Sequence, residues 1–261
     1  MQRSKLKLRR VGQVALALAL AIAIGLSGMA VSCGGEGSTS TTPPAAANAG
    51  TSRSVSFTTE DGVTLTGHLF GSGNSGAILA HMYPADQTSW YPTAERLARE
   101  GYLVLTFDFR GYGESQGTKQ IEHLDRDVVA AIREMASEGV VQVALVGASM
   151  GGTACLIAAD TSKIFSQILV TGVATLSAPV EFKGLSADKA APKILAPLLF
   201  IASENDVGAD GARELQDLAA NKGDLQIVPG NDHGTDLLTG PQASKVWELL
   251  REFLRQALPA T

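Results

Sequence analysis

Strand-like runs of apolar residues alternate with helical patterns along most of this chain. Two short runs, 55–57 and 63–70, flank the turn signal Glu60-Asp61-Gly62, and this arrangement predicts an antiparallel hairpin. Six further apolar runs have the length and composition of buried strands. They are 77–82, 102–109, 141–147, 167–171, 197–202 and 225–228.

Between most of these runs, apolar residues recur at a spacing of three and four, as they do on one face of a helix. The predicted helices are 89–100, 121–138, 150–160, 211–220 and 243–258. An opening hairpin followed by β-α repeats predicts an α/β fold, with a mostly parallel central sheet of about eight strands and helices on both faces. The segment 172–196 has few large apolar residues, so we expect no large cap domain.

The first 32 residues differ in character from the rest. Five basic residues precede an uncharged apolar run from 14 to 26, which predicts a signal peptide over 1–32. The run is too short for a comfortable membrane span of about 20 residues. Ala30-Val31-Ser32-Cys33 resembles a bacterial lipoprotein processing site, with Ala30 where such sites usually carry Leu. We therefore expect Cys33 to be lipidated and the protein to be anchored to the cell membrane, outside the cytoplasm; simple secretion is the alternative.

Residues 33–52 are rich in small and polar residues and lack apolar periodicity, so they predict a flexible tether before a folded domain at 53–261.

The net charge of the chain limits the kinds of partner that it can bind. The chain has 21 basic and 26 acidic residues, and removal of the five leader cations leaves 16 against 26, a net charge of −10. Nucleic-acid binding through a basic surface is therefore disfavoured.

The most informative motif follows the run 141–147. Gly147-Ala148-Ser149-Met150-Gly151 is a G-x-S-x-G sequence placed between a predicted strand and a predicted helix, as a nucleophile elbow requires. Ser149 is thus the candidate nucleophile; a Gly/Ser-rich turn without chemistry fits this context less well. A serine hydroxyl needs a base to remove its proton, and imidazole suits that role.

Three further motifs accompany the elbow in a characteristic order: 80–84 (AHMYP), 108–115 (DFRGYGES), and the pair 203–206 (SEND) and 231–234 (NDHG). Together they resemble the α/β-hydrolase superfamily, over residues 54–257. Members of this superfamily carry the triad in the chain order Ser, acid, His. The resemblance implies Ser149, Asp206 and His233 as the catalytic residues. Glu204 and Asp210 remain alternatives for the acid.

The same resemblance implies an oxyanion hole made by the backbone amides of Met150 and Tyr83. Met82 stands where the family commonly has Gly. We expect His81 to shape this loop rather than to act as a base. In the 108–115 loop, we expect Arg110 and Glu114 to form ion pairs rather than to take part in catalysis.

The sequence is similar to the dienelactone-hydrolase-like and small esterase branches. This implies a serine hydrolase that cleaves small-molecule carboxylic esters through an acyl-enzyme, and the predicted signal peptide adds that it is exported. A peptidase or amidase with the same triad, and a non-catalytic cell-surface binding module, are the alternatives. No cofactor or metal is expected, because the His and Cys residues lack ligand spacing. Cys155, within a predicted helix, is expected to be a small buried hydrophobe.

Overall fold

A computed structural model of the chain describes residues 52–161 and 167–258. Eight strands form its main sheet: β1 (Arg53–Thr58), β2 (Thr64–Phe70), β3 (Ser75–Ala80), β4 (Leu103–Phe107), β5 (Gln142–Ala148), β6 (Leu169–Leu176), β9 (Leu198–Ser203) and β10 (Asp224–Val228). The helices are α1 (Tyr91–Arg99), α2 (Leu124–Ser137), α3 (Met150–Thr161), α4 (Gly208–Leu218) and α5 (Ala243–Ala257). The predicted signal peptide and most of the predicted tether lie outside the described residues.

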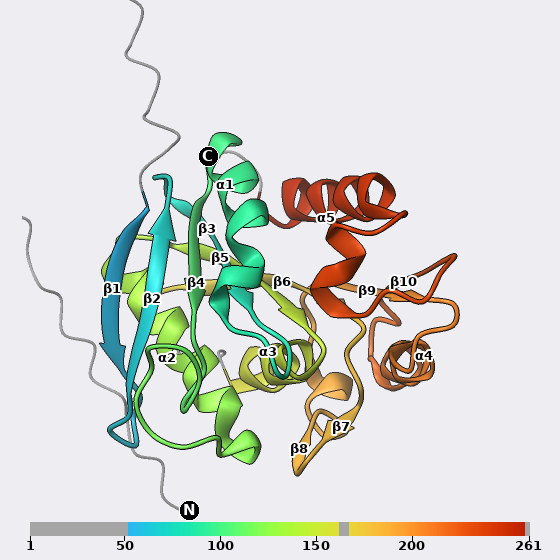
Figure 1. Cartoon of the computed structure of the whole chain (residues 1–261), viewed down its shortest axis with the longest axis horizontal. Helices are drawn as coiled ribbons and strands as arrows, with labels where there is room; N and C mark the ends of the chain where they lie inside the picture. Colours follow the sequence, from blue (N-terminus) through green and yellow to red (C-terminus); the bar gives the residue numbers. More distant parts are fainter. Residues whose placement is uncertain (1–51, 162–166, 259–261) are drawn as a thin grey trace, which may run out of the picture. The chain divides into compact units, whose positions relative to one another are not determined.

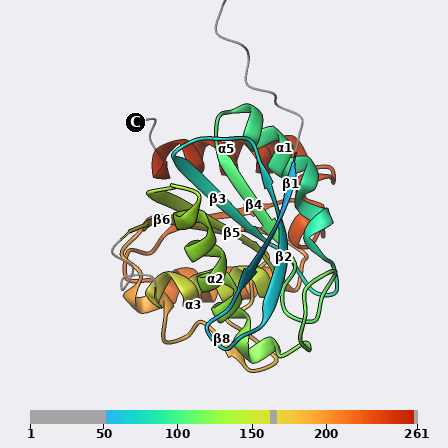
Figure 2. The same cartoon turned by 90° about the vertical axis from the view of Figure 1, so that its left-hand side faces the viewer.

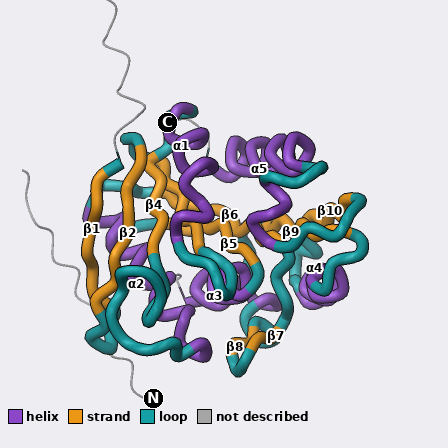
Figure 3. Tube along the Cα trace, in the orientation of Figure 1, coloured by secondary structure: helices purple, strands orange, loops and turns teal. Residues whose placement is uncertain are grey.

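The strands are ordered β1-β2-β4-β3-β5-β6-β9-β10. β2 runs antiparallel to both of its neighbours, β1 and β4, whereas all pairs from β4 to β10 are parallel. The expected α/β fold with a mostly parallel sheet of about eight strands is therefore confirmed, as is the opening hairpin. Figure 3 shows the alternation of strand and helix along the chain.

Helices cover both faces of the sheet (Figures 1 and 2). α1 and α5 pack on one face through residues such as Leu97 and Leu250, and α2, α3 and α4 pack on the other through residues such as Ile132 and Leu156. Strands that are buried on both faces have continuous runs of apolar residues, so they are easily recognised in the sequence. β4 and β5 are such strands.

The order of the strands reverses at β3. The chain moves from β3 outward to β4 and then returns to place β5 on the other side of β3. In open α/β sheets, ligands bind beyond the carboxyl ends of the strands at such a switch point. The loop that follows β3 and the Ser149 turn that follows β5 both lie there.

The sequence-based boundaries differ from the structure most clearly at β6. We predicted a strand over 167–171, but β6 continues through Gly172 to Leu176. Gly172 lies where α5 crosses closely, since a Cβ at this position would come within 2.8 Å of the Phe253 ring. Close packing against α5 therefore requires a glycine inside this strand, where the apolar run of the sequence is interrupted.

No large cap covers the carboxyl ends of the strands in the described part of the chain, as expected. Between β6 and β9, the described chain forms only a two-stranded hairpin, β7 (Glu181–Phe182) and β8 (Leu185–Ser186), and a 3₁₀ turn at Ala191–Lys193. Periodicity could not reveal this hairpin, because each strand has only two residues.

Candidate active site

Ser149 occupies a sharp turn between β5 and α3. Its φ is 49°, in the left-handed region that L-residues other than Asn and Asp rarely adopt, and its amide donates a hydrogen bond of 2.8 Å to the Leu176 carbonyl. The glycines around it are sterically required. A Cβ on Gly147 would lie 2.4 Å from the carbonyl oxygen of Gly151, and a Cβ on Gly151 would lie 2.5 Å from the carbonyl oxygen of Ala80. The turn therefore has the geometry that the elbow motif predicts.

His233 and Asp206 are paired. The Nδ1 atom of His233 lies 2.8 Å from Oδ1 of Asp206, whose side chain is only 4% exposed, compared with 32% for the imidazole. The competing carboxylates lie elsewhere. Glu204 is exposed, and Asp210 is 99% exposed and pairs with Arg213 at 3.0 Å. Of the three candidate acids, the structure places only Asp206 against the imidazole.

Two loops from neighbouring strands hold this pair. Asp206 follows β9 and His233 follows β10; the loops are joined by hydrogen bonds from the Glu204 amide to the Val228 carbonyl and from the Asn205 amide to the Gly230 carbonyl. Parallel strands place their carboxyl ends at the same edge of the sheet. The acid and the imidazole therefore meet although 26 residues separate them in the chain.

The loop of His233 meets the elbow through Gly234. A Cβ at Gly234 would lie 3.4 Å from Cβ of Ala148, the residue before Ser149, and 2.5 Å from Sδ of Met82 in the loop after β3. No hydrogen bond joins the Ser149 hydroxyl to His233 among the described residues. Such bonds are often long in free enzymes and shorten when substrate binds.

His81 is fully buried in the loop after β3. The Phe109 amide donates to Nε2 at 3.1 Å, so the ring proton belongs on Nδ1, which lies 3.0 Å from the Met82 carbonyl oxygen and donates to it. Burial lowers the pKa of His81 below its ordinary value. With both nitrogens engaged, this imidazole fixes the path of the loop.

The amides expected to bind the oxyanion lie on two segments that touch. Met150 begins α3, where the first amides have no partner within the helix. Tyr83 lies two residues after His81, whose carbonyl oxygen would be 2.6 Å from a Cβ on Gly151. In the described segments, neither the Tyr83 amide nor the Met150 amide donates a hydrogen bond to another group. Neither amide is thus engaged by another group of the described chain, and their pairing in an oxyanion hole remains a prediction.

Arg110 is an ion-pairing residue, as expected. Its buried guanidinium binds Asp127 at 2.6 and 2.8 Å and Asp61 at 2.8 and 3.1 Å, linking α2 to the β1–β2 turn. Glu114 differs from our expectation, because this exposed side chain makes no ion pair within the described residues. Its amide donates instead to the buried Asp108 carboxylate at 2.9 Å.

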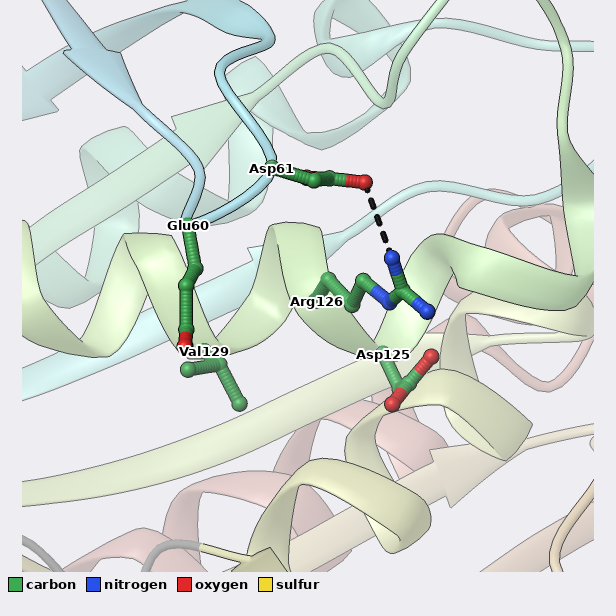
Figure 4. A pocket seen from close by; sticks show the side chains of 5 residues that line it. All are labelled: Glu60, Asp61, Asp125, Arg126 and Val129. Carbon is green, nitrogen blue, oxygen red and sulfur yellow. Dashed lines mark hydrogen bonds and ion pairs between the residues drawn. The ribbon is translucent and has the colours of Figure 1, made fainter.

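A cavity of about 310 Å³ adjoins this network and is lined by Glu60, Asp61, Asp125, Arg126 and Val129 (Figure 4). Asp61 reaches toward Arg126 across it, at 3.1 Å. Arg110 is the main cause that holds the pKa of Asp61 well below its ordinary value. This cluster could not be predicted from the sequence, in which Asp61 is recognisable only as a turn residue.

Cys155 is buried in α3, as expected for a small hydrophobe, and burial raises the pKa of its thiol. Within residues 52–161 and 167–258, no group of three His, Cys, Asp or Glu residues is arranged to hold a metal ion. The helices in this part of the chain are also not long and apolar enough to cross a membrane.

A family model described as alpha/beta hydrolase fold matches residues 77–223, more than half of the chain. The chain belongs to the α/β-hydrolase fold family. The matched region begins in β3 and includes the elbow and Asp206, whereas His233 lies beyond it.

Known relatives of this α/β-hydrolase cover part of it. The protein YfhR of Salmonella typhi is 30% identical over 117 residues, which are 41% of this chain and 40% of the relative. The thiohydrolase aneE of Aspergillus aculeatus is 35% identical over 124 residues, 43% of this chain and 39% of the relative. The chain thus spans about two fifths of the length of these relatives.

Among solved structures, the esterase Pf2001 of Pyrococcus furiosus superimposes with a TM-score of 0.66 at 20% identity, over 79% of this chain and 90% of that protein. At this identity, the likeness establishes the shared fold.

Proposed function

We propose that this α/β-hydrolase is a serine hydrolase that cleaves carboxylic esters through an acyl-enzyme, with Ser149, His233 and Asp206 as its triad. The pairing of His233 with buried Asp206 is the observation that carries the proposal. It leaves Nε2 as the imidazole atom available to the nucleophile, and the Gly234 contacts bring the His233 loop against the elbow.

In this reaction, Ser149 Oγ attacks the ester carbonyl while its proton passes to Nε2 of His233. The amides of Met150 and Tyr83 stabilise the negative charge on the carbonyl oxygen. As the tetrahedral intermediate collapses, the C–O bond to the alcohol breaks, and His233 gives its proton to the departing oxygen. Water then attacks the acyl-enzyme by the same route, which releases the acid and restores Ser149. Asp206 fixes the imidazole tautomer and stabilises the imidazolium.

Two kinds of observation favour ester substrates. Pf2001, which shares the fold, is named an esterase, and aneE, which is similar over 43% of this chain, is named a thiohydrolase. The short hairpin at 181–186 also leaves the carboxyl ends of the strands without a large cap, which suits small and medium acyl groups of the kind cleaved by the dienelactone-hydrolase-like and small esterase branches.

The proposal is tested by measuring hydrolysis of p-nitrophenyl esters of increasing acyl length beside an amide and a peptide panel. We expect turnover of the short esters, and Ser149→Ala should lower it about 10⁴- to 10⁶-fold and abolish labelling by a fluorophosphonate. Preferential cleavage of the amides or peptides would favour the peptidase alternative. Absence of turnover and labelling in the wild-type protein would favour the binding module.

We also propose that the protein is exported and held at the cell membrane by a lipid on Cys33. The basic residues, the apolar run and Cys33 itself support this, and all lie outside the described residues. Diacylglyceryl attachment supplies the two chains that stable anchoring requires. Expressed with its own leader, the protein should fractionate with membranes, and Cys33→Ser should release it. An unmodified N-terminus beyond Cys33 would instead show simple secretion.

A further inference from the structure

Lys183 lies at the tip of the β7–β8 hairpin with an unusual backbone conformation. Its φ is 49°, and that of Gly184 is 90°, so both central residues of this two-residue turn are left-handed. Gly, Asn and Asp adopt this conformation at little cost, whereas lysine is strained there. The turn alone therefore does not account for a lysine at position 183.

The Lys183 side chain reaches the loop of the proposed oxyanion hole. Its Nζ lies 4.3 Å from the ring centroid of Tyr83 and 5.3 Å from that of Phe182, and the two rings lie 5.8 Å apart. Both distances are within the range of cation–π interactions. The ammonium therefore lies over the side chain of the residue whose amide is proposed to bind the carbonyl oxygen.

No carboxylate of residues 52–161 or 167–258 forms an ion pair with Lys183. The neighbouring acids are engaged otherwise or point elsewhere: Glu181 accepts a hydrogen bond from the Gly184 amide at 2.6 Å, and Glu122, which lies beside Gly184, makes no ion pair in the described chain. The positive charge of Lys183 is thus left without an anionic partner at the edge of the candidate site.

A second ammonium approaches the same loop from another element. Lys119 Nζ lies 4.3 Å from the Tyr112 ring centroid, and Lys119 also has no ion pair within the described segments. Tyr112 packs edge-on against His81 at 5.0 Å, and its hydroxyl is 3.9 Å from Sδ of Met150. Two lysine ammonium groups without carboxylate partners in the described chain therefore contact the aromatic rings around the loop after β3.

We propose that Lys183 is a specificity-determining residue that favours ester substrates with a carboxylate a few bonds from the scissile ester. A substrate whose carbonyl oxygen binds the Tyr83 amide can extend along the Tyr83 side chain, where a carboxylate meets the Lys183 ammonium. The two rings hold that exposed ammonium beside Tyr83, where a substrate carboxylate can accept a charge-assisted hydrogen bond from it. This inference rests on the proposed ester hydrolysis and specifies its substrate class.

The test compares matched esters with and without the charge. Monomethyl glutarate and methyl pentanoate have nearly the same shape near the scissile bond, and the wild-type, full-length protein would be assayed with each by pH-stat titration. We expect a higher kcat/KM for the glutarate ester. Lys183→Met should lower that value about five- to tenfold, mainly through KM, and change the pentanoate value less than about twofold.

Three controls separate charge recognition from a structural role. Lys183→Arg should retain most of the preference, and Lys183→Glu should reduce glutarate hydrolysis further than Lys183→Met. Lys189→Met removes another exposed lysine from the same segment and should leave both substrates unchanged. The preference for the glutarate ester should also decrease as the salt concentration is raised from about 0.05 to 0.5 M. Over this range the Debye length falls from above about 10 Å to a few Å.

Equal losses on both esters in Lys183→Met would overturn the proposal and assign Lys183 a structural role in holding the hairpin over Tyr83. An unchanged ratio of the two kcat/KM values would overturn it as well. In either case, Ser149-dependent hydrolysis of methyl pentanoate would leave the proposed function intact. Loss of the proposed function itself is recognised separately, because the wild-type protein would then hydrolyse neither ester.

Discussion

Nδ1 of His233 lies 2.8 Å from Oδ1 of Asp206, and Oδ2 of the same carboxylate is buried without a partner among the described residues. A buried carboxylate with a free oxygen is costly unless a nearby positive charge can form. In the proposed mechanism, transfer of the serine proton to His233 creates that charge. The pair is thus arranged so that its interaction strengthens during the reaction rather than before it.

Asp206→Asn should lower kcat for esters by about 10²- to 10⁴-fold, because the amide can no longer hold the Nδ1–H tautomer and stabilise the imidazolium. Steady-state hydrolysis of a short p-nitrophenyl ester measures the effect. Glu204→Gln, on the same loop, and Asp210→Asn, in the first turn of α4, are matched controls, and both should retain wild-type activity. A crippled Glu204 or Asp210 variant with an active Asp206→Asn would show that the acid is misassigned.

Gly151→Ala should both destabilise the protein and reduce its activity. The added methyl would lie 2.5 and 2.6 Å from the carbonyl oxygens of Ala80 and His81, so backbone must shift at the elbow and at the proposed oxyanion loop. We expect a loss of about 1–3 kcal/mol in the free energy of unfolding by urea titration. Fluorophosphonate labelling should slow as well.

Gly139→Ala provides the comparison for this variant. It also adds one methyl, at a φ of 85°, but into open space at the end of α2. Its cost is backbone strain alone, and kcat should not change. Equal losses of activity in the two variants would contradict a specific role for the contact at Gly151.

Asp61→Asn should destabilise the protein in a pH-dependent manner. The Arg110 guanidinium holds the pKa of Asp61 below its ordinary value of 3.8, so its stabilisation is complete above roughly pH 5 and is lost as the pH falls. At neutral pH we expect the variant to lose about 1–3 kcal/mol, the range for hydrogen bonds to charged groups. Urea titrations between pH 7 and pH 3 measure the difference.

Glu60→Gln is the control for Asp61→Asn. Glu60 lies beside Asp61, but its side chain is 79% exposed and pairs with Arg133 on the surface. The variant should remain within about 0.5 kcal/mol of the wild type at every pH. If Asp61→Asn behaved in the same way, the buried Arg110 network would not be a source of stability.

His81→Gln should flatten the loss of stability on mild acidification. The folded state holds His81 neutral, with a pKa below the ordinary value of 6.5, so its contribution is present above pH 6.5 and is lost as the pH falls. Each pH unit below that value costs up to about 1.4 kcal/mol. Glutamine can keep one donor toward Met82 and one acceptor toward Phe109 without titrating. Parallel stability curves for wild type and variant between pH 7 and pH 5 would refute this.

Much of the fold could be predicted from local patterns, because buried parallel strands are continuous apolar runs and the helices between them have one apolar face. The elbow was equally visible, since its chemistry depends on adjacent residues around Ser149. What the sequence concealed depends on contacts between distant segments. Gly172 interrupts an apolar pattern because Phe253, 81 positions later, packs against it.

Contacts between segments that are distant in the sequence also escaped prediction near the candidate active site. Arg110 could be assigned to ion pairing from its loop, but its partners Asp61 and Asp127 come from a turn and a helix that no local pattern connects. No sequence motif or periodicity indicated a role for Lys183 in substrate recognition. Its significance arises only because the hairpin lies against Tyr83, a contact set by tertiary packing rather than by periodicity.

The imidazole proposed to be the catalytic base is held by the outermost part of the sheet. β10 pairs with β9 alone, and its loop carries His233, whereas Ser149 is fixed between central strands. Edge elements open at lower free energy than the centre of a fold. When β10 separates from β9, His233 leaves the elbow while the hydrophobic core is still intact. Loss of activity should therefore precede loss of structure as denaturant is added, and the β10 amides should exchange with solvent before those of β5.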